Sequence, residues 1–145
     1  MAKVIFGNHT AVFAVRSEQD RIRKFYGDVL GCKVRMKSDE VDRFQLADVH
    51  FCFVWQSVAL DEGDFLKATY LELKTDRPQE MRQRILAFGV KKLDVPDAHL
   101  YFQAPGGQVF RLVGIDEDLS VYEGSPSSRP GSSALASQMR GRAPT

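Results

Sequence analysis

The sequence predicts an α+β fold made of two successive copies of one βαβββ unit. An apolar strand run, an amphipathic helix that ends at a glycine and three further strand runs occur twice, at an offset of about 59 residues. The interval from the first strand to the glycine after the helix is also alike, 20 residues in the first copy and 19 in the second. We expect the copies to cover about residues 8–57 and 68–115, with their strands forming a cup-shaped mixed sheet and the helices outside.

The first copy begins with a strand at Thr10–Val15, where β-branched and apolar residues are concentrated. The helix that follows is expected to have Ser17 as its N-cap and Asp20 in its first turn. Its apolar residues recur at spacings of three and four, and Gly31 ends it. The stripe consists of Ile22, Phe25, Tyr26, Val29 and Leu30. The three strand runs that follow are Lys33–Lys37, Arg43–Leu46 and Val49–Trp55.

The second copy repeats this order from Tyr70–Lys74, its first strand. Asp76 and Gln79 are expected to cap the next helix, which ends at Gly89. Its apolar stripe consists of Met81, Ile85 and Phe88. The remaining strand runs are Lys91–Asp94, His99–Gln103 and Gln108–Gly114. Because side chains alternate between the faces of a strand, we expect one face of each unit to pack on its helix and the other to line a cavity.

The length and composition favour a single cytoplasmic domain. The chain has 145 residues, of which 43% are hydrophobic, enough for a core without disulfides or a structural metal. Its two cysteines, Cys32 and Cys52, form no disulfide framework, which favours a reducing compartment. Apolar runs such as Phe51–Trp55 are far shorter than the roughly 18 residues of a membrane span, and no secretory signal is visible. We therefore expect no membrane partner.

Residues 124–145 differ in composition from the rest of the chain. They contain six serines, three prolines, three glycines and three arginines, but no acidic and no aromatic residue. Such a segment buries too little apolar surface to offset its ordering entropy, so we expect a flexible tail after a domain of residues 1–123. That domain has 17 basic and 19 acidic residues, a net charge of −2. The basic cluster Arg21, Arg23 and Lys24 lacks interleaved aromatic residues, so we expect it to be solvated and predict no nucleic-acid partner.

Two short motifs mark the end of the first helix and the start of the last strand. Residues 25–31 read FYGDVLG, and residues 104–110 read APGGQVF. The first resembles the FYxxxLG signature, and the second the DPxGN turn, of the vicinal oxygen chelate superfamily, which comprises glyoxalase, bleomycin-resistance and extradiol-dioxygenase proteins. The resemblance covers about residues 8–114 and implies the glyoxalase/bleomycin-resistance/dioxygenase fold and a homodimer. Within it, Phe25 and Tyr26 are expected to pack the helix on the sheet.

Most catalytic members of this superfamily hold a divalent metal, and the resemblance assigns four ligand positions to this chain. The last-strand glutamate falls on Arg111, whose protonated guanidinium offers no lone pair to a metal. The first-strand histidine falls on Ala11, its equivalent in the second copy falls on Tyr70, and the fourth position falls near Cys52. Because the usual ligands are replaced, we predict no cofactor.

A shifted divalent-metal site is an alternative. Period-2 alternation places His9 on the face of Ala11 and Glu72 on the face of Tyr70. The candidate ligands are His9, His50, Cys52 and Glu72. These donor types suit zinc or nickel. Plainer interpretations are also open, with His9 as an edge-strand residue and Cys52 as a small buried hydrophobic residue.

The leading functional interpretation is metal-independent binding of a small organic molecule in the sheet cavity, similar to the bleomycin-resistance branch. Arg111 would offer a forked cation to a carboxylate, phosphate or polar oxygen of the ligand, and Glu72 would orient Arg111. Aromatic residues would supply apolar walls, with Trp55 either among them or facing the helix. The expected ligand-binding residues are Phe13, Cys52, Tyr70, Glu72, Tyr101 and Arg111.

An enzyme of the same superfamily, a lyase, isomerase, epimerase or dioxygenase, is the alternative function. With a metal, His9 and Glu72 would be ligands. Without one, Glu72 would act as general base and Arg111 would stabilise an enolate-like oxyanion, which makes these two the candidate catalytic residues. That mechanism needs room for a substrate between the two side chains. The simplest interpretation of Glu72 and Arg111 is an ion pair across the sheet.

Overall fold

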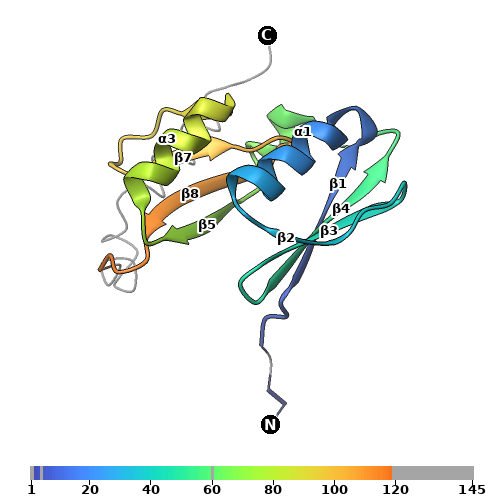
Figure 1. Ribbon diagram of the computed structural model, residues 1–145, viewed down its shortest axis with the longest axis horizontal. Coiled ribbons are helices and arrows are strands. Elements are labelled where there is room, and N and C mark those ends of the chain that lie inside the picture. The colour runs from blue at the N-terminus through green and yellow to red at the C-terminus, as the bar shows by residue number, and fades with distance from the viewer. Residues whose placement is uncertain (1, 4, 60, 119–145) are drawn as a thin grey trace. The chain divides into compact units, whose positions relative to one another are not determined.

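The structure is a computed structural model that describes residues 2–3, 5–59 and 61–118. It divides the chain into two compact units, Met1–Leu60 and Asp61–Thr145, which we call unit 1 and unit 2 and describe separately. Each unit contains four strands and at least one helix in βαβββ order (Figure 1). The predicted α+β fold with tandem βαβββ units is thereby confirmed. The arrangement of the two sheets into a cup stays a prediction.

Unit 1 forms a mixed four-stranded sheet with the order β1-β4-β3-β2. Its strands are β1 (His9–Val15), β2 (Lys33–Met36), β3 (Val41–Leu46) and β4 (Val49–Gln56). β1 runs parallel to β4, whereas β3 pairs antiparallel with both β4 and β2. The chain leaves β1 through a 3-10 turn (Arg16–Glu18), α1 (Gln19–Lys24) and a π-helical turn (Phe25–Val29). Parallel strands require such a crossover because both run in the same direction.

Tyr26 is the centre of the aromatic core between this helical segment and the sheet. It is buried, and its ring centroid lies 5.4 Å from that of Phe51 and 4.8 Å from that of Phe53. Trp55 stacks on Phe53 with centroids 6.0 Å apart, so it belongs to the face that packs on the helix and not to a cavity wall. Gly31 follows with a φ of +71°, the left-handed conformation that ends the helix. The predicted packing role of Tyr26 is confirmed.

Unit 2 contains a second mixed sheet with the order β5-β8-β7-β6. Its strands are β5 (Tyr70–Thr75), β6 (Lys91–Leu93), β7 (Leu100–Gln103) and β8 (Val109–Gly114). β5 runs parallel to β8, and β7 pairs antiparallel with β8 and β6, which repeats the topology of unit 1. α3 (Pro78–Phe88) connects β5 to β6 and ends at Gly89, whose φ is +95°. A short helix that the sequence did not predict, α2 (Glu62–Phe65), precedes β5.

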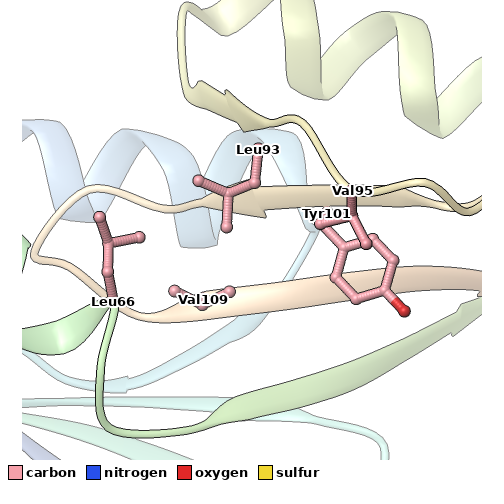
Figure 2. Packing of buried hydrophobic residues seen from close by; sticks show 5 residues of the cluster. All are labelled: Leu66, Leu93, Val95, Tyr101 and Val109. Atoms are coloured by element: carbon pink, nitrogen blue, oxygen red, sulfur yellow. The ribbon is translucent and has the colours of Figure 1, made fainter. Parts of the chain in front are cut away.

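The two faces of the unit 2 sheet are covered by different elements. Leu100 and Leu112 face α3, because both line a cavity together with residues of that helix. Tyr101 and Val109 alternate with them along their strands and therefore point to the opposite face. On that face an apolar cluster forms, shown in Figure 2: Leu66, Leu93, Val95, Tyr101 and Val109. Because Leu66 comes directly after α2, the segment before β5 covers part of a face that the sequence analysis expected to be open.

Both predicted helix caps are wrong. Ser17 lies inside the 3-10 turn, and the N-cap of α1 is Glu18, which makes no side-chain cap hydrogen bond. The N-cap of α3 is Arg77, also without a side-chain cap bond, and Pro78 takes the first helical position. Proline presets a helical φ and has no N–H that needs a partner, so α3 starts there without a cap from Asp76.

The basic cluster of α1 is not wholly solvated, contrary to expectation. Asp42, fully buried on β3, accepts hydrogen bonds from Nε of Arg23 at 2.6 Å and from its Nη2 at 2.9 Å. The backbone N–H of Ser38 donates to the same carboxylate at 3.2 Å, and Nε1 of Trp55 lies 3.4 Å from it. The hydrogen bond to Asp42 raises the pKa of Arg23 above its ordinary value. This ion pair therefore connects α1 to β3.

Two further predictions concern membrane-spanning helices and the C-terminal tail. The described ranges contain no helix that is long and apolar enough to cross a bilayer. The predicted tail, residues 124–145, lies outside the described residues.

Candidate functional site

Arg111 lies in the middle of β8, on the face of the unit 2 sheet that is turned away from α3. Its direct neighbours across the sheet are Glu72 on β5 and Tyr101 on β7. Paired residues of neighbouring strands point to the same face, so the three side chains meet. All three residues were predicted from the sequence to contact the ligand, and the register of the sheet brings them together.

A buried ion pair joins Arg111 to Glu72. Arg111 is only 4% exposed, and its Nη2 donates a hydrogen bond to Oε2 of Glu72, whose side chain is 28% exposed. The guanidinium carbon also lies 6.0 Å from the ring centroid of Tyr70. Burial acts to lower the pKa of Arg111, but its hydrogen bond with Glu72 and the neighbouring Tyr101 outweigh burial and raise the pKa above its ordinary value. Arg111 is therefore a permanent cation on this face.

Tyr101 supports this pair from the interior of the unit. Its side chain is 1% exposed, and its ring centroid lies 5.9 Å from that of Tyr70. The hydroxyl donates a hydrogen bond to Oδ2 of Asp97 at 3.0 Å, and Tyr101 is the cross-strand neighbour of Arg111. Burial raises the pKa of Tyr101 to about 12, so the hydroxyl keeps its proton at neutral pH. Tyr101 was predicted to line a cavity, whereas the structure buries it within the apolar cluster of Figure 2.

His99 bridges two carboxylates beside this group. Its Nδ1 lies 2.6 Å from Oδ1 of Asp97, and its Nε2 lies 2.5 Å from Oε1 of Glu117. Both ring nitrogens can donate only when the imidazole is protonated. Burial acts to lower the pKa of His99, but the hydrogen bonds with Glu117 and Asp97 outweigh burial and raise it. His99 also lines, with Arg82 and Leu112, a cavity of about 340 Å³ on the α3 side of the sheet.

We expect the free energy of unfolding to fall as the pH rises through the pKa of His99. Because this pKa is raised above the value of about 6.5 in an unfolded chain, the stabilising contribution is complete below about pH 6.5 and is lost through the folded-state pKa. The pKa values of Asp97 and Glu117 are lowered, so both carboxylates stay charged over this range. Urea denaturation of the wild type and His99→Gln from about pH 5.5 to 9 measures the effect. If the difference in free energy of unfolding between the two proteins does not become smaller as the pH rises, this prediction is wrong.

The sheet registers locate the positions that correspond to the superfamily's metal ligands. In unit 1, Ala11 pairs with Cys52. In unit 2, the residue that pairs with Arg111 is Glu72, not Tyr70. Cys52 and Arg111 are 59 residues apart in the sequence, but Ala11 and Glu72 are 61 apart. Counting along the sequence at one constant offset therefore missed the equivalent position by two residues.

These four positions do not suit a divalent metal. Ala11 has no donor atom in its side chain, and the guanidinium of Arg111 has no lone pair. The carboxylate of Glu72 is hydrogen-bonded to that cation and its charge is balanced by it. These residues therefore do not fit the divalent metal that the family resemblance implies.

The structure does not assemble the shifted metal site either. Its expected ligands were His9, His50, Cys52 and Glu72. In the parts of the chain that the structure describes, no group of three or more His, Cys, Asp and Glu residues is placed to hold a metal ion. His9 pairs directly with His50, but Cys52 lies two residues further along β4, about 7 Å away along a strand. Glu72 is engaged by Arg111.

The remaining expected ligand contacts belong to unit 1. Phe13 on β1 is 59% exposed, and Cys52 on β4 is 2% exposed. Val12, which alternates with Phe13, is buried on the opposite face, so Phe13 points away from the helical side. Burial raises the pKa of the other cysteine, Cys32, to about 11, which keeps its thiol protonated and unreactive.

The contact between Glu72 and Arg111 also bears on the enzyme hypothesis. A general base with an oxyanion-stabilising partner needs the substrate between the two groups. In the structure the two side chains are hydrogen-bonded directly to each other. The arrangement therefore favours the ion-pair interpretation.

The two βαβββ units have the fold of the glyoxalase, bleomycin-resistance and dioxygenase proteins. Solved structures confirm this. The chain is similar to a putative glyoxalase family protein from Bacillus anthracis, with 17% identity and a TM-score of 0.62 over 79% of this chain and 98% of that chain. It is similar to the fosfomycin resistance protein FosX from Mesorhizobium loti, with 15% identity and a TM-score of 0.63 over 83% and 100%.

A third similar structure is a mutant of FosX from Listeria monocytogenes in complex with Mn(II) and 1S,2S-dihydroxypropylphosphonic acid. It is 13% identical, with a TM-score of 0.62 over 76% of this chain and 90% of that chain. At such identities the likeness establishes the fold. No protein-family model matches the sequence, and no curated protein matches it.

Three polar residues near the site were missed by the sequence analysis: Asp97, His99 and Glu117. Asp97 and His99 lie in the bend before β7 (Leu100–Gln103), so the alternation of side chains along that strand does not predict their contacts. Glu117 follows β8, and only the fold brings it to His99 across a separation of 18 residues.

Proposed function

We propose that the protein binds a small organic molecule with a carboxylate, phosphonate or other polar oxygen group, without a metal, on the unit 2 sheet face around Arg111. The observation that carries the proposal is a guanidinium held at 4% exposure beside Glu72 and Tyr70, on the face turned away from α3. A buried ion pair is often no more stabilising than apolar residues of similar volume. A role in recognition therefore explains this pair better than stability does.

Arg111 and the residues around it would each contact a different part of the ligand. The planar guanidinium carries N–H donors whose spacing matches two oxygens of one carboxylate or phosphonate group. Tyr70, half-buried next to it, would contact an apolar part of the ligand. Glu72 lies at the more exposed end of the pair and would orient Arg111 or accept a hydrogen bond from the ligand. The ligand contacts expected from the sequence for Phe13 and Cys52 stay predictions.

One of the similar structures supports the choice of ligand class. The FosX mutant from Listeria monocytogenes holds a small phosphonate together with Mn(II). In the present chain, Arg111 occupies a position to which the family resemblance assigns a metal ligand. We infer that the guanidinium supplies the positive charge that a metal supplies in that protein.

Titration calorimetry with benzoate and phenylphosphonate tests the proposal, with benzamide as the neutral probe of similar shape. We expect the anionic probes to bind more tightly than benzamide and to shift the NMR signals of Tyr70, Glu72 and Arg111. Arg111→Met removes the cation and keeps an unbranched side chain, and it should weaken the affinity for the anions at least about tenfold. Arg77→Met is the matched control, since Arg77 is an exposed arginine of the same unit that pairs with Glu80.

Two outcomes would contradict the proposal. The first is that neither anionic probe shifts these signals at millimolar concentration. The second is that Arg77→Met loses as much affinity as Arg111→Met. The same titrations in excess chelator, together with metal analysis after incubation with nickel, zinc, manganese and ferrous iron, examine metal dependence. Binding that requires one of these ions would overturn the metal-independent form of the proposal.

A homodimer, which the family resemblance implies, and a cytoplasmic location stay predictions. Light scattering on the purified full-length chain measures the first.

A further inference from the structure

The cavity on the α3 side of the unit 2 sheet has no part in the proposed function. Its volume is about 340 Å³, and it lies between α3, the start of β7, the end of β8 and the turn that follows β8. α3 packs beside β8, as Figure 1 shows. The lining includes Pro78, Arg82, His99, Leu100, Leu112 and Glu117. This volume is within the range of sites that hold small organic ligands.

The sheet side of the cavity is apolar. Leu100 on β7 and Leu112 on β8 are direct neighbours across the sheet, and they are 2% and 6% exposed. Both are aliphatic, and both line the cavity. An aliphatic part of a ligand that covers them leaves water for an apolar surface, which is favourable.

Arg82 brings a positive charge to this cavity from α3. It comes four residues after Pro78 and three before the buried Ile85, and these spacings place the three residues on one face of the helix. Arg82 is half-buried, and within the described part of the chain it has no hydrogen bond or ion pair. A cation that is partly shielded from water and not neutralised attracts an anion more strongly than a fully solvated one.

Glu117 also lines the cavity, but both of its carboxylate oxygens already have partners. Oε1 lies 2.5 Å from Nε2 of His99, and Oε2 accepts a hydrogen bond from the backbone N–H of Gly114 at 3.2 Å. The other ring nitrogen of His99, Nδ1, lies 2.6 Å from Oδ1 of Asp97. His99 and Glu117 therefore form a polar wall that is held in place, and the charge of Arg82 remains available to a ligand.

We propose that this cavity is a second binding site, which takes a small carboxylate with a short aliphatic chain. The guanidinium of Arg82 would receive the carboxylate through two parallel N–H···O hydrogen bonds, and Leu100 and Leu112 would contact the aliphatic chain. The site goes beyond the proposed function, because it lies on the opposite face of the unit 2 sheet from Arg111.

Hexanoate is the probe, and hexanamide is the neutral molecule of the same shape. Each is titrated into the full-length chain, and binding is followed by the NMR methyl signals of Leu100 and Leu112. We expect hexanoate to shift both signals until they saturate, and hexanamide to bind at least about fivefold more weakly. Arg82→Met removes the charge and keeps an unbranched apolar side chain, so it should weaken hexanoate binding at least about fivefold and leave hexanamide binding unchanged.

Two further variants test the charge and the space separately. Arg84→Met is the matched control, because Arg84 is an exposed arginine of the same helix outside the cavity lining. It should change the affinity for hexanoate by no more than about twofold, since distant surface charges are screened by salt. Ala98 is exposed and lines the cavity, so Ala98→Leu should reduce the space and weaken the binding of both probes.

The results distinguish this site from the face around Arg111. The inference is overturned if hexanoate leaves the signals of Leu100 and Leu112 unchanged at millimolar concentration, or if Arg82→Met binds it as tightly as the wild type. Equal losses of affinity in Arg82→Met and Arg84→Met would also overturn it, because a general effect of charge would then explain the binding. If hexanoate shifts the signals of Tyr70 and Glu72 instead, the second site is wrong and the proposed function stands.

Discussion

Replacing Asp42 with alanine is expected to lower the free energy of unfolding by about 3 kcal/mol, the lower end of the cost of removing one partner from a buried ion pair. The carboxylate is fully buried and accepts two hydrogen bonds from Arg23 and one from the backbone of Ser38. Its removal leaves these donors without their acceptor. Arg23 remains 24% exposed and can recover some hydration, so we expect the lower end of the range.

Urea denaturation of Asp42→Ala measures this cost, and Asp42→Asn should fall between it and the wild type because the amide keeps one acceptor oxygen. Glu80→Ala is the matched control. It breaks the ion pair with Arg77, whose side chain is 69% exposed, and should cost no more than about 0.5 kcal/mol. A loss for Asp42→Ala as small as that of the control would show that the pair with Arg23 contributes little.

Replacing Gly107 with alanine is expected to cost about 2 kcal/mol or more, because the backbone conformation and the available space both oppose a side chain. Gly107 has a φ of +110°, which residues other than glycine rarely adopt. An added Cβ would lie 2.6 Å from Cδ2 of Phe65 at the end of α2. Phe65 would therefore have to move, and α2 with it.

Two other glycines separate these contributions. Gly89 has a φ of +95° with open space around it, so Gly89→Ala reports the conformational cost alone, about 1 kcal/mol. Gly27 lies in the π-helical turn with neither constraint, and Gly27→Ala should be neutral or stabilising. Thermal and urea denaturation of the three variants gives the comparison. If Gly107→Ala and Gly89→Ala lower the free energy of unfolding equally, Phe65 moves away from the added Cβ without a loss of stability.

The order of the strands and helices could be predicted because each element depends on a short-range pattern. Apolar and β-branched runs mark the strands, and a left-handed glycine, Gly31 or Gly89, ends each main helix. The repeated order then constrains the topology of both units. α2 was missed because its four residues are too few for a helical period to appear.

The candidate site could be predicted only in part. Glu72 and Arg111 stand out in the sequence because a charge inside an apolar strand needs a partner. Their pairing depends on the register of β5 against β8, and the count along the sequence placed Tyr70 where the register places Glu72. Asp42 went unnoticed, because nothing in its neighbourhood distinguishes a buried carboxylate from the solvated ones.

By itself, the sequence determined the repeated βαβββ organisation, the residues that end the helices and the replacement of the expected metal ligands by Ala11 and Arg111. Only the tertiary structure decided that Arg111 is paired with Glu72 and lies beside Tyr101, and that Asp97 joins Tyr101 to His99. The reason is physical. Strand and helix signals arise within a few neighbouring residues, whereas the partner of a buried charge is set by strand register and by segments that meet only when the chain folds.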